Sequence, residues 1–220
     1  MSRPDPDLCA EAGHDAGTAD RKDQAGMSNK SISGSSGYGI EKHAHIFAAW
    51  AASRAASVKG CRFDVRQGRN ILEKCGFKPE LSKPEHLPEA SAIDSQHRIW
   101  REQACDFAKN HVKADTFELT HGVAAKLINV YLKSRFVCGG YHDHPRVMAL
   151  HPPIDKELLK ALARKNFGGH GEEWKNASNK GWSKMTSCDY EGLITLIRDN
   201  LQKKPLWMIE EYWKGHQCAT

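Results

Sequence analysis

Apolar residues recur at helical spacing through most of this chain from about residue 40 onward, and no segment alternates like a half-buried strand. The stretch 40–58 is dense in good helix formers, with Ile46, Phe47 and Trp50 near one face. Further helices are expected over 64–75, after a cap at Asp94 or Ser95, and on either side of Pro205. These patterns predict an all-α fold.

The N-terminal segment has a different composition. Residues 1–37 are rich in Gly, Ser, Asp and Ala and carry no apolar periodicity. Such a segment does not bury enough apolar surface to offset the entropy of ordering it. We therefore expect 1–37 to be disordered and 38–220 to form one helical domain.

Two short stretches of the helical part hold the residues of greatest chemical interest. The first is GVAAKLINVYL, which begins at Gly122 and contains Lys126 and Asn129. The second is PPID, which ends at Asp155, just before the apolar run Leu158, Leu159 and Leu162. Two prolines stop any earlier helix and an aspartate favours the N-cap position, so Asp155 is expected to cap a helix.

Together these stretches, within about 117–165, resemble the signature of the helix-hairpin-helix DNA glycosylases related to endonuclease III and 8-oxoguanine glycosylase. In that family a glycine turn opens a helix, a lysine follows four residues later, and a capping aspartate comes after a proline-containing segment. The resemblance implies two helical lobes with a cleft between them. It makes Lys126 and Asp155 the catalytic pair, and makes double-stranded DNA with a damaged or modified base the partner.

The chemistry of such a pair can be stated from the residues. A lysine with a pKa near 10.4 is a poor nucleophile at neutral pH, but partial burial and a helix N-terminus both lower that pKa. The free amine then attacks the anomeric carbon and forms a Schiff base, while a carboxylate stabilises the positive charge that develops on the sugar. If Lys126 is only structural, Asp155 activates a water instead.

The glycine turn departs from the family pattern, because His121, Gly122, Val123 and Ala124 stand where Pro-Gly-x-Gly is usual. Backbone amides of such a turn bind one phosphate without reading sequence, so these four residues are the predicted DNA contacts. The stretch between Lys126 and Asp155 is longer than usual, which makes 138–151 an inserted loop. An extruded base needs a pocket, for which the available candidates are His43, Trp50, His142 and His144.

No metal or other cofactor is expected. His142 and His144 lack a third ligand at a recognisable spacing, and the four-cysteine cluster that binds iron–sulfur in endonuclease III is absent after Asp155. The seven cysteines are odd in number and form no C-x-x-C, which favours reduced thiols in a cytoplasmic protein. No stretch approaches the roughly 18 to 20 consecutive apolar residues that a membrane-spanning helix needs.

The net charge of +5 permits contact with a phosphate backbone without requiring it. The sequence therefore predicts a DNA glycosylase that serves repair or restricts foreign modified DNA, and that also cleaves abasic sites if Lys126 is the nucleophile. It leaves the oligomeric state unknown, with a monomer favoured. Two alternatives remain open at this point: a non-catalytic helical DNA-binding module, and a helical interaction protein of a defence system.

Overall fold

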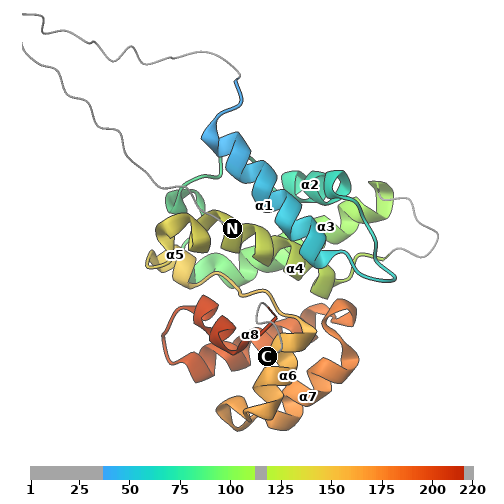
Figure 1. Ribbon diagram of the computed structural model, residues 1–220, viewed down its shortest axis with the longest axis vertical. Coiled ribbons are helices and arrows are strands. Elements are labelled where there is room, and N and C mark those ends of the chain that lie inside the picture. The colour runs from blue at the N-terminus through green and yellow to red at the C-terminus, as the bar shows by residue number, and fades with distance from the viewer. Residues whose placement is uncertain (1–36, 112–117, 216–220) are drawn as a thin grey trace, which may run out of the picture. The chain divides into compact units, whose positions relative to one another are not determined.

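Helices dominate the computed structural model, which describes residues 37–111 and 118–215 (Figure 1). No strand forms among these residues, and one isolated bridge joins Val58 to Cys61. The all-α prediction is confirmed. The α-helices are α1 (Ile40–Ala56), α2 (Val65–Lys74), α3 (Ile93–His111), α4 (His121–Leu132), α5 (Pro145–Met148), α6 (Lys156–Arg164), α7 (Gly171–Lys180) and α8 (Ser187–Leu201).

Shorter or irregular turns connect these helices. A π-helix, η3 (Lys133–Tyr141), continues α4 and contains Gly140, whose φ of 91° lies in the left-handed region. The other five are 3₁₀ turns: η1 (Pro84–His86), η2 (Ala90–Ala92), η4 (Phe167–Gly169), η5 (Trp182–Lys184) and η6 (Leu206–Tyr212). The segment 138–151, expected to be a loop, thus contains the end of η3 and all of α5.

The chain divides between Gly37 and Tyr38, and the residues from Tyr38 onward form one compact unit. The disorder expected for 1–37 concerns residues that, apart from Gly37, lie outside the described part. No helix of the described residues has both the length and the apolar character needed to cross a membrane.

Two hydrophobic clusters make up the interior. The first is built from α1 to α5 and includes Phe77, Tyr131 and Phe136. The second is built from α6 to α8 and η6 and includes Trp174 and Leu162. Helix α4 contributes side chains to both clusters, because Leu127 and Ile128 belong to the first cluster and Ala125 belongs to the second. This makes α4 the element that joins them.

Helix α1 turns alanines toward the interior, and these small residues let α1 lie close to α4. Phe47 and Trp50 lie together on its outer surface, where they are 57% and 48% exposed. The prediction of a helix cap at Asp94 or Ser95 was wrong. Asp94 does not cap α3 but lies in its first turn, where its carboxylate binds Arg198 and His151. Partners this far away along the chain leave no local trace in the sequence.

Candidate functional site

Lys126 lies in the second turn of α4, and its side chain is 9% exposed. The Thr120 hydroxyl caps α4 by accepting a hydrogen bond from the Val123 amide, at 3.2 Å. The Lys126 amine is 3.0 Å from Asp155 Oδ2 and 4.7 Å from the centre of the Trp182 ring. Burial lowers the pKa of Lys126, while the negative charge of Asp155 opposes that shift.

Asp155 caps α6, as the sequence predicted. Its Oδ1 accepts a hydrogen bond from the Leu158 amide at 2.9 Å, which fixes the carboxylate at the helix N-terminus. Its Oδ2 accepts from Lys126 Nζ and from Trp213 Nε1, each at 3.0 Å. Three donors from three parts of the chain therefore hold one carboxylate beside a buried amine.

A second ion pair lies next to the first. The Lys133 amine, in the first turn of η3, binds the Glu210 carboxylate of η6 and lies 5.8 Å from the centre of the Trp213 ring. Burial raises the pKa of Glu210, and the hydrogen bond from Lys133 acts in the opposite direction. The site thus holds two amines and two carboxylates, with Trp213 touching both pairs.

A cavity of about 190 Å³ opens beside these groups. It is several times the roughly 30 Å³ share of a water molecule, and smaller than the 300–1,000 Å³ or so of typical small-molecule pockets. In this state it admits a group of a few heavy atoms. Its walls combine the two ion pairs with small and apolar side chains: Ala55, Lys126, Val130, Lys133, Ser134, Pro153, Asp155, Glu210 and Trp213.

The residues of the predicted hairpin form the first turn of α4. The amides of Gly122, Val123 and Ala124 all donate within the protein, to Met185 O, Thr120 Oγ1 and Thr120 O. These three residues are buried, and His121 is partly buried. Burial lowers the pKa of His121, whose Nδ1 has no hydrogen-bond partner among the described residues. Phosphate binding by this turn stays a prediction, and the site described above does not depend on it.

The candidate base-pocket residues do not gather at the cavity. A hydrogen bond of 2.8 Å joins His43 Nδ1 to the Tyr38 hydroxyl, and Trp50 packs on Phe47 at the surface of α1. His142 lies 3.3 Å from Asp143, and His144 caps α5. None of the four lines the cavity beside Lys126. Among the described residues, no group of three or more His, Cys, Asp or Glu is placed to hold a metal ion.

Comparison of the chain with protein-family models, with curated proteins and with solved structures gave no match.

Sequence reasoning missed part of the site. The motif that contains Lys126 and Asp155 includes none of the other charged or aromatic side chains found here, which are Lys133, Trp182, Glu210 and Trp213. Glu210 and Trp213 come from the far end of the chain, and only the fold brings them to Lys126. A weak signal was present nonetheless, because Glu210 falls among apolar residues in the sequence LWMIEEYW.

Proposed function

We propose that this protein is a DNA glycosylase whose catalytic pair is Lys126 and Asp155. The observation that carries the proposal is a buried amine, with a lowered pKa, held 3.0 Å from a carboxylate at the edge of a cavity. Buried lysines with lowered pKa values are a recurring way to obtain an amine nucleophile near neutral pH. The cavity corresponds in this proposal to the cleft expected from the family resemblance.

In the proposed reaction, the uncharged Lys126 amine attacks the anomeric carbon of the extruded nucleotide. The new nitrogen–carbon bond forms as the bond between the sugar and the base breaks; the base departs with the electron pair and takes up a proton, while the amine nitrogen loses one. The nitrogen lone pair then expels the ring oxygen, which takes up a proton as the sugar opens, and the carbon–nitrogen double bond that results is the protonated Schiff base. Asp155 stabilises the positive charge that develops on the sugar.

The supports of Asp155 suit that role. The Leu158 amide and Trp213 Nε1 hold its two oxygens, so the carboxylate keeps its position when the Lys126 proton is lost. An electrostatic group that is already in place costs no reorganisation at the moment of reaction. The 190 Å³ cavity has room for the reacting edge of a sugar, and extrusion of a whole base requires the surrounding side chains to move.

Borohydride trapping on an abasic duplex tests the proposal. We expect wild-type protein to form a covalent adduct with the DNA and the Lys126→Met variant to form none. Lys133→Met is the matched control, because it removes a second amine from the same cavity. An absence of adduct with wild-type protein, or an undiminished adduct with Lys126→Met, would rule out Schiff-base chemistry at this residue.

Base release is measured separately on a panel of duplexes that carry modified bases. If Asp155 activates a water instead and Lys126 is only structural, then Lys126→Met still releases the base, and neither wild-type protein nor the variant forms the adduct. Asp155→Asn, which keeps a hydrogen-bond acceptor for the Leu158 amide, is expected to release no base in either case. Release of a base by Asp155→Asn at the wild-type rate would contradict the assignment of Asp155.

A further inference from the structure

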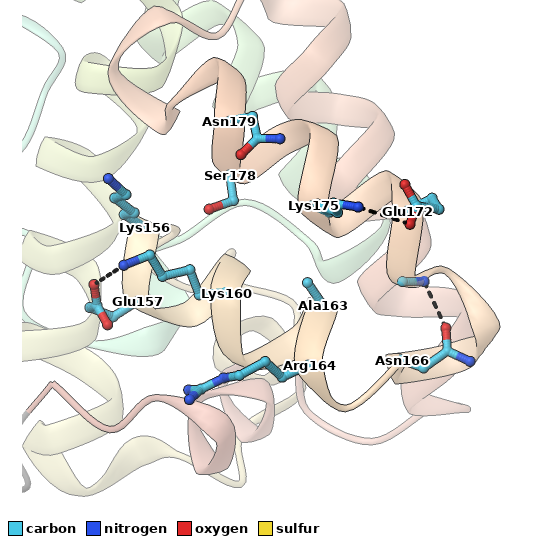
Figure 2. Close-up of a pocket in the computed structure, with 11 residues that line it drawn as sticks. Lys156, Glu157, Lys160, Ala163, Arg164, Asn166, Glu172, Lys175, Ser178 and Asn179 are labelled. Atoms are coloured by element: carbon cyan, nitrogen blue, oxygen red, sulfur yellow. Dashed lines mark hydrogen bonds and ion pairs between the residues drawn. The ribbon is translucent and has the colours of Figure 1, made fainter.

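A second, larger cavity lies away from Lys126, between helices α6 and α7. Its volume is about 820 Å³, and Figure 2 shows side chains of both helices facing it. Lys156, Lys160 and Arg164 come from α6, and Lys175, Ser178 and Asn179 come from α7. We call this cavity the α6–α7 groove. The catalytic pair proposed above does not use it.

The spacing of α6 explains why its basic residues face outward together. Leu158, Leu159 and Leu162 fill the second hydrophobic cluster, which sets the inward face of the helix. Lys156, Lys160 and Arg164 follow each other at intervals of four residues, so they form one row on another face. Neighbours in that row are about 6 Å apart along the helix axis, and the whole row spans about 12 Å.

The groove carries a surplus of positive charge. Four basic side chains line it against two carboxylates, those of Glu157 and Glu172. Each carboxylate is within reach of a lysine three residues away in its own helix, at 3.4 Å and 3.3 Å. Such exposed pairs contribute little and are easily exchanged for another anion. Lys156 and Arg164 make no ion pair with any residue that the structure describes.

The lining also indicates which kind of anion fits. No aromatic side chain of the described residues lines the groove, so a free nucleotide would find no surface on which to stack its base. A row of cations flanked by the neutral donors Ser178 and Asn179 is instead suited to a chain of phosphates. Phosphates of one strand of duplex DNA recur every 3.4 Å or so along the axis, and a row of about 12 Å therefore spans about four of them.

We propose that the α6–α7 groove binds the sugar–phosphate backbone of duplex DNA. The identity of the polymer rests on the proposed function, because Asp155 immediately precedes Lys156 and the row of cations begins beside the proposed catalytic carboxylate. Backbone held along α6 keeps the neighbouring stretch of DNA next to the cavity that contains Lys126.

The test compares two double variants that lose the same charge. Lys160→Gln with Arg164→Gln removes two cations from the groove, and Arg66→Gln with Lys74→Gln removes two exposed cations from α2. Fluorescence anisotropy with an undamaged duplex gives the affinity between about 50 and 200 mM salt. We expect the groove variant to lower the slope of log affinity against log salt by about 2, since each lost phosphate contact removes about 0.9. The α2 variant is expected to keep the wild-type slope.

Borohydride trapping with saturating abasic duplex separates this inference from the proposed function. A groove variant that keeps the wild-type salt slope overturns the groove assignment, even if it still forms the adduct. A reduced slope in the groove variant supports the assignment, even if wild-type protein forms no adduct. Equal losses of DNA affinity in the groove variant and the α2 variant overturn the groove assignment. A competition experiment adds unlabelled poly-glutamate or unlabelled duplex DNA to the complex, and stronger competition by poly-glutamate also overturns the assignment. Thermal unfolding of each variant establishes that the folded protein is compared throughout.

Discussion

The two partners of the buried pair are predicted to differ sharply in what their removal does to stability. Among the described residues, Asp155 accepts three hydrogen bonds, whereas the Lys126 amine has one hydrogen-bond partner, Asp155. Replacement of Asp155 by Ala therefore leaves several groups without their acceptor. Replacement of Lys126 by Met leaves Asp155 with the Leu158 amide and Trp213 Nε1, and it fills a similar volume with an apolar chain.

The magnitudes follow from these contacts. Loss of an N-cap side chain costs typically about 1 kcal/mol. Removal of one partner from a buried ion pair costs about 3–5 kcal/mol, because the other charge is left without compensation. When Asp155 is removed, Lys126 avoids part of the ion-pair cost by losing its proton. The loss of the N-cap and the loss of the ion pair are therefore not simply added. We expect Asp155→Ala to lower the free energy of unfolding by about 3–5 kcal/mol at neutral pH, and Lys126→Met to change it by at most about 1 kcal/mol in either direction.

The pH dependence gives a second measure of the same contacts. Because the pKa of Lys126 in the folded protein lies below 10.5, the unfolded chain binds the proton more tightly than the folded protein does. Wild-type stability therefore rises with pH between the lowered pKa and 10.5, and is lost as pH falls through that window. The Lys126→Met variant lacks this pH-dependent contribution to stability. Its stability relative to wild type is expected to decline steadily as pH approaches 10.5.

Urea unfolding followed by tryptophan fluorescence measures these differences across a series of pH values. Lys133→Met serves as the control, because Lys133 lines the same cavity and pairs with a different carboxylate. A loss of stability in Lys126→Met as large as that in Asp155→Ala would refute the reasoning. The pair would then be a structural salt bridge to which both partners contribute alike, and the case for a poised amine would fail.

Three further predictions concern the rest of the fold. Gly122→Ala is expected to lower the free energy of unfolding by about 1–3 kcal/mol through overpacking, since the new Cβ would lie 1.8 Å from the backbone oxygen of Trp182. Gly192→Ala places its Cβ in open space on α8 and should raise the free energy of unfolding by about 1 kcal/mol. Thermal unfolding of both variants checks the two signs. Burial lowers the pKa of both His97 and His151, so the unfolded chain takes up protons before the folded protein does as pH falls below 6.5. Urea titrations at a series of pH values should therefore show the free energy of unfolding falling from about pH 6.5 downward. A free energy that does not change over this range would contradict the burial of these histidines. Burial raises the pKa of Cys61, Cys75 and Cys105 to about 12, 12 and 11, so iodoacetamide should label these three thiols slowly. It should label the exposed Cys138 and Cys188 faster, and peptide mass spectrometry measures the rates. Equal rates in the two sets would contradict the burial of the first three cysteines.

The features that could be predicted from the sequence are those with local causes. Asp64 and Asp155 each precede an apolar-periodic run, and each accepts a hydrogen bond from the amide three residues later. Pro205 separates α8 from η6 because proline lacks an amide proton and cannot continue the helix. Short-range signals of this kind depend on neighbours in the chain, so the order of residues is enough to find them.

Features with distant causes could not be predicted in this way. The inward face of α1 is set by how closely it packs on α4, and that favours alanines over the larger Phe47 and Trp50. Glu210 and Trp213 join the site only because η6 packs against α6 and α8. The motif predicted Lys126 and Asp155 as neighbours, whereas the groups around them in the candidate site required the fold.

Asn129 explains how Asp155 can be held in place without the contact to Lys126. It lies one helical turn after Lys126, is fully buried, and has its side-chain oxygen 2.7 Å from His97 Nε2. Its amide nitrogen donates to the carbonyl of Pro152 and to the Tyr190 hydroxyl, each at 2.9 Å. Neutral hydrogen bonds thus tie the Pro152 segment, and with it Asp155, to α4. Because this tie does not involve Lys126, the amine can lose its proton or its contact to Asp155 while the carboxylate remains where a reaction would need it.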